Sequence, residues 1–216
     1  MRTTARPGTD GGAPRPTSSR GALPAVVAAV CFLLGFTGRG LVESFVVFLL
    51  PLSTEFGLDR ASAVSIYALS VLGTGIGGPV VGRVFDRAGP RAVYTTGLAL
   101  IGVGLSLAAF ATRLWHLQVC VGLAVGLGAA CLGNVSNASL LGRWFSTRLT
   151  LVTSIVFSSF GIGILVVVPA AQLAIDAFGW RSAYHWIGGL TLALLVPLSL
   201  LPWRTFAAGS PEVARQ

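Results

Sequence analysis

Arg39 and Glu43 are charged side chains that lie deep within a long apolar stretch, residues 22–52. If this stretch crosses a membrane, an unpaired charge at their depth costs roughly 2.5–3.5 kcal/mol, so each charge needs a partner or a water-filled cavity. Their spacing of four residues places both on one face of a helix, where they can pair with each other. Alternatively, the forked donors of Arg39 attract a small organic anion, and Glu43 exchanges a proton when the pair opens.

Neutral polar side chains in two later apolar stretches are candidates for the same cavity. They are Asn134, Asn137, Ser158 and Ser159. Amide and hydroxyl groups orient a polar ligand through hydrogen bonds. The same groups also join neighbouring membrane helices to each other, so the sequence is compatible with either role.

A charged segment interrupts the apolar sequence between two of these stretches. Its residues are Gly82, Arg83, Val84, Phe85, Asp86, Arg87, Ala88, Gly89, Pro90 and Arg91. So many charges in a short segment must lie where the membrane meets water. Gly82 permits a close helix crossing, Gly89 permits a tight turn, and Asp86 can accept hydrogen bonds from helix N-terminal amides and arginines.

The elements that position these residues are predicted to be transmembrane helices. Hydrophobic residues make up 54% of the chain, charged residues only 10%, and the mean hydropathy is +0.81. Six apolar stretches are long enough to cross the roughly 30 Å hydrocarbon layer. They cover residues 22–52, 62–82, 92–112, 116–141, 149–175 and 182–203. Because they lack the alternating pattern of an outer-membrane barrel, the sequence predicts an all-α membrane protein with a six-helix bundle at 22–203.

The arginines predict how the bundle is oriented. Eleven flank the helices on the side of the chain ends, and three, Arg60, Arg113 and Arg181, flank them on the other. This bias places both termini in the cytoplasm, with a disordered tail at 1–21 and a short tail at 204–216. The net charge of +8 follows this membrane pattern and does not indicate nucleic acid. Since every strongly basic residue is Arg and none is Lys, we expect a bacterial inner-membrane protein.

The charged segment resembles the signature loop of the major facilitator superfamily, written G-x-L-x-D-R-x-G-R-R. The matching residues are Gly82, Asp86, Arg87, Gly89 and Arg91. Val84 and Pro90 depart from the pattern. The resemblance implies two inverted three-helix repeats, and a weak internal similarity between residues 60–75 and 148–163 has the form expected of them. It also implies that Asp86 is a latch to a second six-helix half, whereas the residues alone require only that the loop sets topology.

Further segments resemble the monocarboxylate and oxalate-formate branch of that superfamily. They are residues 50–52, 55–57, 59–61, 143–145 and 179–181. The resemblance implies a secondary transporter that moves a small organic anion by alternating access. A complete transporter of this kind needs two halves, and 216 residues supply one. We therefore expect a truncated product, a fragment, or a half that pairs with a second half or as a homodimer.

Two alternatives to a transporter are an intramembrane enzyme and a membrane protein that does not transport. An intramembrane serine protease needs a Gly-x-Ser-Gly setting and a deep histidine, but residues 158–161 do not provide that setting, and His116 and His185 lie at the ends of helices. The sequence also has no metal-ligand cluster, phosphate loop or dinucleotide motif, so we expect neither an enzyme nor a cofactor. The remaining alternative is a non-transporting membrane interaction protein, the remnant of a half-transporter.

Overall fold

The computed structural model describes residues 19–146 and 148–209, and the regular elements in that part of the chain are all helical. They are α1 (Ser19–Glu43), α2 (Phe45–Phe56), α3 (Arg60–Ala108), α4 (Leu114–Leu117), the π-helical segment η1 (Gln118–Ala124), α5 (Val125–Leu132), α6 (Asn134–Gly142), α7 (Leu149–Ala193), α8 (Leu195–Leu200) and α9 (Trp203–Ala208). Most of the predicted N-terminal tail and the end of the C-terminal tail, residues 1–18 and 210–216, lie outside the described residues. Residues 204–208, predicted as tail, are part of α9.

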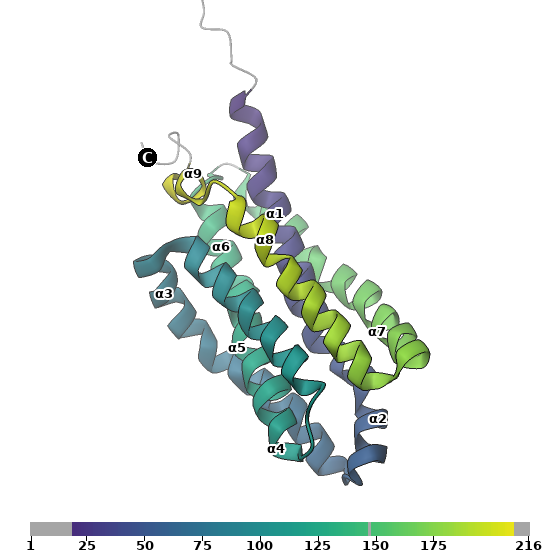
Figure 1. Ribbon diagram of the computed structural model, residues 1–216. Helices are drawn as coiled ribbons and strands as arrows, with labels where there is room; N and C mark the ends of the chain where they lie inside the picture. Colours follow the sequence, from purple (N-terminus) through teal and green to yellow (C-terminus); the bar gives the residue numbers. More distant parts are fainter. Residues whose placement is uncertain (1–18, 147, 210–216) are drawn as a thin grey trace, which may run out of the picture.

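Two of the long helices fold back on themselves at a glycine. Gly89 has φ 79° and ψ 175°, and Gly179 has φ 77° and ψ 160°. This region of positive φ is open to glycine and strained for other residues. Each glycine therefore reverses the chain, and α3 and α7 each consist of two antiparallel helices (Figure 1).

The four apolar segments that are long enough to span a membrane consequently make six crossings, as the sequence predicted. We number the crossings from the N-terminus. Crossing 1 is α1 with α2, crossings 2 and 3 are residues 60–88 and 90–108, crossing 4 runs from α4 to α6, and crossings 5 and 6 are residues 149–178 and 180–200. The chain is thus an all-α membrane protein, and its crossings form two three-helix units.

The start of α1, the Gly89 turn, the end of α6 and helix α9 lie at one end of the bundle (Figure 1). We call this the basic end, because the arginines at 83, 87, 91, 143 and 148 flank the helices there. The connection between α2 and α3, the start of α4 and the Gly179 turn lie at the opposite end. The arrangement matches the charge bias on which the predicted orientation rests.

Glycines bring the helices into close contact at two equivalent places. In crossings 4 and 2, a Cβ atom built on Gly126 would lie 2.8 Å from the Cα atom of Ser70. In crossings 1 and 5, a Cβ atom on Gly40 would lie 2.8 Å from the carbonyl oxygen of Gly163. Crossings 2 and 5 hold the same position in their three-helix units, as do crossings 4 and 1. The two contacts are therefore related by the inverted repeat that the sequence predicted.

Candidate functional site

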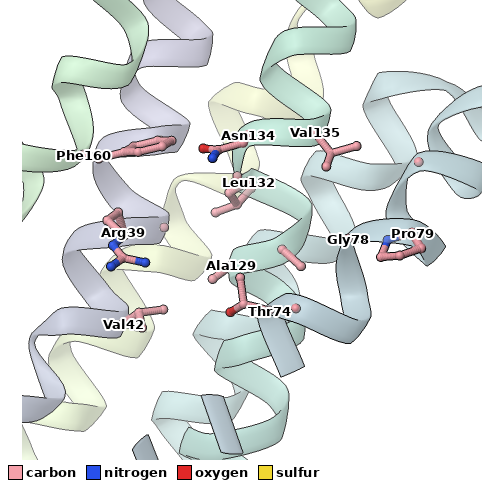
Figure 2. Close-up of a pocket in the computed structure, with 16 residues that line it drawn as sticks. Arg39, Val42, Thr74, Gly78, Pro79, Ala129, Leu132, Asn134, Val135 and Phe160 are labelled. Atoms are coloured by element: carbon pink, nitrogen blue, oxygen red, sulfur yellow. The ribbon is translucent and has the colours of Figure 1, made fainter. Parts of the chain in front are cut away.

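A cavity of about 840 Å³ lies between crossings 1, 2, 4 and 5 (Figure 2). Its lining residues are Gly35, Gly38, Arg39, Val42, Thr74, Gly75, Gly78, Pro79, Gly82, Ala129, Ala130, Leu132, Gly133, Asn134, Val135 and Phe160. Most of these side chains are small, so space remains between the helices where larger residues would fill it. Glycines in crossing 2 thus have two roles: Gly77 packs against Ala130 of crossing 4, whereas Gly78 and Gly82 border the cavity.

Arg39 is the charged residue of this lining, and its guanidinium group projects from α1 into the cavity (Figure 2). Its Nη2 atom lies 2.6 Å from Oε1 of Glu43, so the ion pair that the spacing allows is present. The Arg39 side chain is 49% exposed and that of Glu43 is 15% exposed. The pair therefore presents its positive member to the cavity and keeps its negative member close to the protein.

Glu43 has a second partner that the sequence analysis did not identify. The hydroxyl group of Tyr67, in crossing 2, donates to the Glu43 carboxylate, 3.1 Å from Oε2 and 3.2 Å from Oε1. Glu43 is also the last residue of α1, and the chain continues into α2 through Ser44, which keeps helical backbone angles, φ −61° and ψ −18°. There the Ser44 hydroxyl donates to the carbonyl oxygen of Leu41 at 2.8 Å. The carboxylate thus lies where crossing 1 changes from α1 to α2.

Asn134 lines the cavity at the start of α6 (Figure 2). Crossing 4 is interrupted immediately before it, because Gly133 has extended backbone angles, φ −87° and ψ −158°. The first N–H groups of α6 therefore lack partners within the helix. Thr74, which the sequence analysis missed, also lines the cavity, but its hydroxyl group donates to the carbonyl oxygens of Ser70 and Gly126, at 2.8 Å and 3.1 Å.

The other polar candidates lie away from the cavity lining. Asn137 is fully buried, accepts a hydrogen bond from the Tyr94 hydroxyl at 3.0 Å, and donates to the carbonyl oxygen of Leu132 at 3.2 Å. Its position fits the alternative role in joining helices. Ser159 is buried against Gly35 in the contact between crossings 5 and 1, and Ser158 is exposed and donates to the carbonyl oxygen of its own helix at residue 155. The structure thus gathers Arg39 and Asn134 at the cavity, with Glu43 beside Arg39.

The charged segment forms the turn between crossings 2 and 3. Gly89 makes the reversal, and the side chains of Asp86, Arg87 and Arg91 are exposed. Asp86 forms no salt bridge with the residues that the structure describes. Phe85, in contrast, is buried, and the Arg143 guanidinium lies 5.1 Å from the centre of its ring. The turn is therefore anchored by an aromatic side chain, while its charges face outward.

Two of the segments that suggested a family branch bind each other at the end opposite the basic end. Arg181 Nη2 lies 2.8 Å from Oε1 of Glu55, and Trp180 donates its indole N–H to the other carboxylate oxygen. Arg181 Nη1 also donates to the carbonyl oxygens of Ala109 and Ala111, at 2.9 Å and 3.0 Å. One side chain thereby joins the ends of crossings 1 and 3 to the start of crossing 6.

The model of the Major Facilitator Superfamily matches residues 24–215. The chain belongs to the major facilitator superfamily. Human monocarboxylate transporter 12 is 32% identical over 171 residues, which cover 79% of this chain and 33% of that protein. Human monocarboxylate transporter 11 is 34% identical over 181 residues, which cover 81% of this chain and 38% of that protein.

The fold of this superfamily member matches that of the xylose transporter XylE from E. coli in its inward-open conformation. The TM-score is 0.68 at 16% sequence identity, and the match covers 89% of this chain and 50% of that chain. The family and the all-α membrane fold predicted from the sequence are confirmed. Members of the superfamily are transporters, in agreement with the expectation that the chain is not an enzyme. The chain spans only 33–38% of the length of the two human relatives.

Proposed function

We propose that this chain forms one half of a secondary active transporter that moves a small organic anion, such as a monocarboxylate, by alternating access. The observation that carries the proposal is the guanidinium group of Arg39, which faces a cavity of about 840 Å³ lined mainly by small and apolar residues. A positive charge in surroundings of low dielectric constant attracts anions more strongly than the same charge in water. The names of the similar animal proteins, which are monocarboxylate transporters, support the same class of ligand.

In the proposed site, Arg39 binds the carboxylate of the anion and Asn134 orients its polar groups. The interruption at Gly133 also favours an anion at this site. The free N–H groups at the start of α6 and the helix dipole both stabilise a negative charge. Glu43 balances the charge of Arg39. The ligand is therefore an anion small enough to fit between crossings 1, 2 and 4.

We further propose that a second six-helix half completes the cavity, supplied by the same kind of chain or by a different one. Support comes from the match to 50% of the XylE chain and from the exposure of Asp86 at the basic end. In the complete assembly Asp86 forms a latch with a helix of the second half, and Arg87 and Arg91 help to hold the turn. The arginine bias supports a cytoplasmic position for the basic end and for both termini.

Uptake of labelled L-lactate into proteoliposomes that contain the complete assembly tests the proposal. We expect Arg39→Ala to reduce uptake at low lactate concentration by about tenfold or more, since a charge-assisted contact to the anion is lost. Arg113→Ala is the matched control, because it removes an exposed arginine at the end remote from the basic end, and it should leave uptake unchanged. Full lactate uptake by the Arg39→Ala protein refutes the proposed anion site.

The alternative function is that of a non-transporting membrane interaction protein. It is favoured by large apolar side chains that crossing 5 exposes, such as Leu165 and Leu173, which are 74% and 69% exposed. These residues would then bind a partner helix rather than line the outside of a transporter. A purified chain that stays monomeric, together with the absence of an adjacent reading frame for six further helices, would favour this alternative over transport.

A further inference from the structure

In the Arg39–Glu43 pair, a neighbouring helix holds Glu43 in place but not Arg39. Glu43 is the more buried side chain, and it is bound by Arg39 from its own helix and by Tyr67 from crossing 2. Arg39 is half exposed and, among the described residues, it forms its salt bridge through Nη2. The anchored carboxylate therefore fixes one corner of the guanidinium group and leaves the remaining N–H groups for the cavity.

Tyr67 is well placed to act as that anchor. Its ring stacks on Phe45, with ring centres 6.3 Å apart and an angle of 14° between the planes. Phe45 is the first residue of α2 and lies two residues after Glu43. The aromatic pair and the hydroxyl–carboxylate hydrogen bond thus hold the end of α1 and the start of α2 against crossing 2.

The hydrogen bond between Tyr67 and Glu43 lies next to the cavity. Crossing 1 runs away from the basic end and crossing 2 returns towards it, so Glu43 and Tyr67 both lie beyond the cavity's remote end, which Val42 and Thr74 border. Glu43 is one helical turn beyond Arg39. The guanidinium group is thereby held from the remote end of the cavity.

We infer that Tyr67 is a positioning residue for the anion site, which acts by fixing Glu43 and, through Glu43, the plane of the Arg39 guanidinium group. The inference rests on the proposed function. A guanidinium group carries five N–H donors in fixed directions, and a carboxylate binds two of them at once only when the plane is correctly oriented. Tyr67 achieves this orientation when the protein folds, so that the anion does not have to impose it on binding.

Tyr67→Phe tests the inference, because it removes the hydroxyl group and keeps the ring that stacks on Phe45. In the complete assembly we expect the dissociation constant for L-lactate to rise about threefold to tenfold, as for the loss of one hydrogen bond to a charged group. The transport rate at saturating lactate should change by less than about twofold, because the bound anion itself reorients Arg39. Tyr94→Phe is the matched control, since it also deletes a hydroxyl group that joins two helices, away from the cavity, and should leave the constant unchanged.

A double-mutant cycle separates positioning from general packing. If Tyr67 acts through Glu43, then Tyr67→Phe should have no further effect on lactate binding in the Glu43→Ala background. An equal effect of Tyr67→Phe in both backgrounds overturns the inference, and so does a wild-type dissociation constant in the single variant.

A measurement without anion distinguishes failure of this inference from failure of the proposed function. The ¹⁵N signal of the Arg39 side chain, assigned by its loss in Arg39→Lys, can be recorded for the full chain in lipid nanodiscs. In Tyr67→Phe we expect the line to broaden, or the separate guanidinium signals to merge, because the group reorients more freely. In Tyr94→Phe the signal should stay unchanged. If the signal responds in this way but lactate does not bind the wild-type assembly, the proposed function is wrong and the positioning role stands. An Arg39 signal that is unaffected by Tyr67→Phe overturns the positioning role, whatever lactate does.

Discussion

The contact between crossings 1 and 5 predicts that Gly163→Ala is less stable than Gly161→Ala, although the two glycines are only two residues apart. A Cβ atom on Gly163 would meet the Phe36 backbone, at 3.1 Å from its carbonyl carbon and 3.2 Å from its Cα atom, and closer still to its carbonyl oxygen. Backbone atoms cannot rotate away, so the two helices must separate. A Cβ atom on Gly161 would meet no heavy atom within 4 Å. Gly161→Ala is therefore the matched control for Gly163→Ala.

The size of the difference follows from two effects. Overpacking of a tight contact costs about 1–3 kcal/mol. Replacement of glycine by alanine within a helix stabilises it by about 1 kcal/mol, and this gain is common to both variants. Gly163→Ala should therefore be about 1–3 kcal/mol less stable than Gly161→Ala. For a chain of this size the melting temperatures should differ by about 2–12 °C, which the monodisperse fraction of heated, detergent-solubilised protein measures. Equal melting temperatures for the two variants would refute the close approach of crossings 1 and 5.

Three further predictions concern the connections at the two ends of the bundle. Arg181→Ala should lower the free energy of unfolding by about 1–3 kcal/mol in heated detergent samples, because three helix ends lose a common partner, whereas Arg113→Ala at the same end should have little effect. Hydrogen bonding by the Ser62 side chain and backbone holds the pKa of Asp59 below its ordinary value of 3.8, so its contribution to stability is present above that value and is lost as pH falls through the folded-state pKa. Asp59 is the N-cap residue of α3 and accepts a hydrogen bond from the Ser62 N–H at 3.2 Å. Asp59→Asn should remove this acid-side dependence from a melting series, and an unchanged dependence would contradict the role of the Asp59 carboxylate as that cap. Finally, Ala88→Cys should react with an impermeant thiol reagent added from the cytoplasmic side only, and labelling from outside would overturn the proposed orientation.

The number of helices and their alternating up-and-down order could be predicted from the sequence, because both depend on local properties. Apolar length sets the crossings, and the charged segment containing Gly89 marks a turn. The Arg39–Glu43 pair was open to prediction for the same reason, since it needs only one helix. Tyr67 was missed because it lies 24 residues from Glu43 in sequence, and its contact depends on how crossings 1 and 2 pack.

The sequence could not show which of Asn134 and Asn137 lines the cavity and which joins helices. The two residues are three positions apart, so both could face one side of a helix. The structure separates them because Tyr94 of crossing 3 donates to Asn137 and because the interruption at Gly133 leaves Asn134 at the start of a new helix, beside the cavity. Which neutral polar residue meets the cavity is decided by the neighbouring helices and not by spacing along the chain.

The two turns at which the chain reverses share a pattern that the sequence analysis overlooked. Residues 86–91 and 176–181 both read Asp-x-x-Gly-x-Arg, and their glycines have nearly the same backbone angles, φ 79° and 77°. In the second turn Arg181 is bound within the chain, by Glu55 and two carbonyl oxygens. In the first turn the corresponding charges, Asp86 and Arg91, are exposed and form no salt bridge with the described residues. An inverted repeat thus supplies the same turn at both ends of the bundle. At one end it joins helices within the half, and at the basic end its charges remain accessible to the second half that we propose.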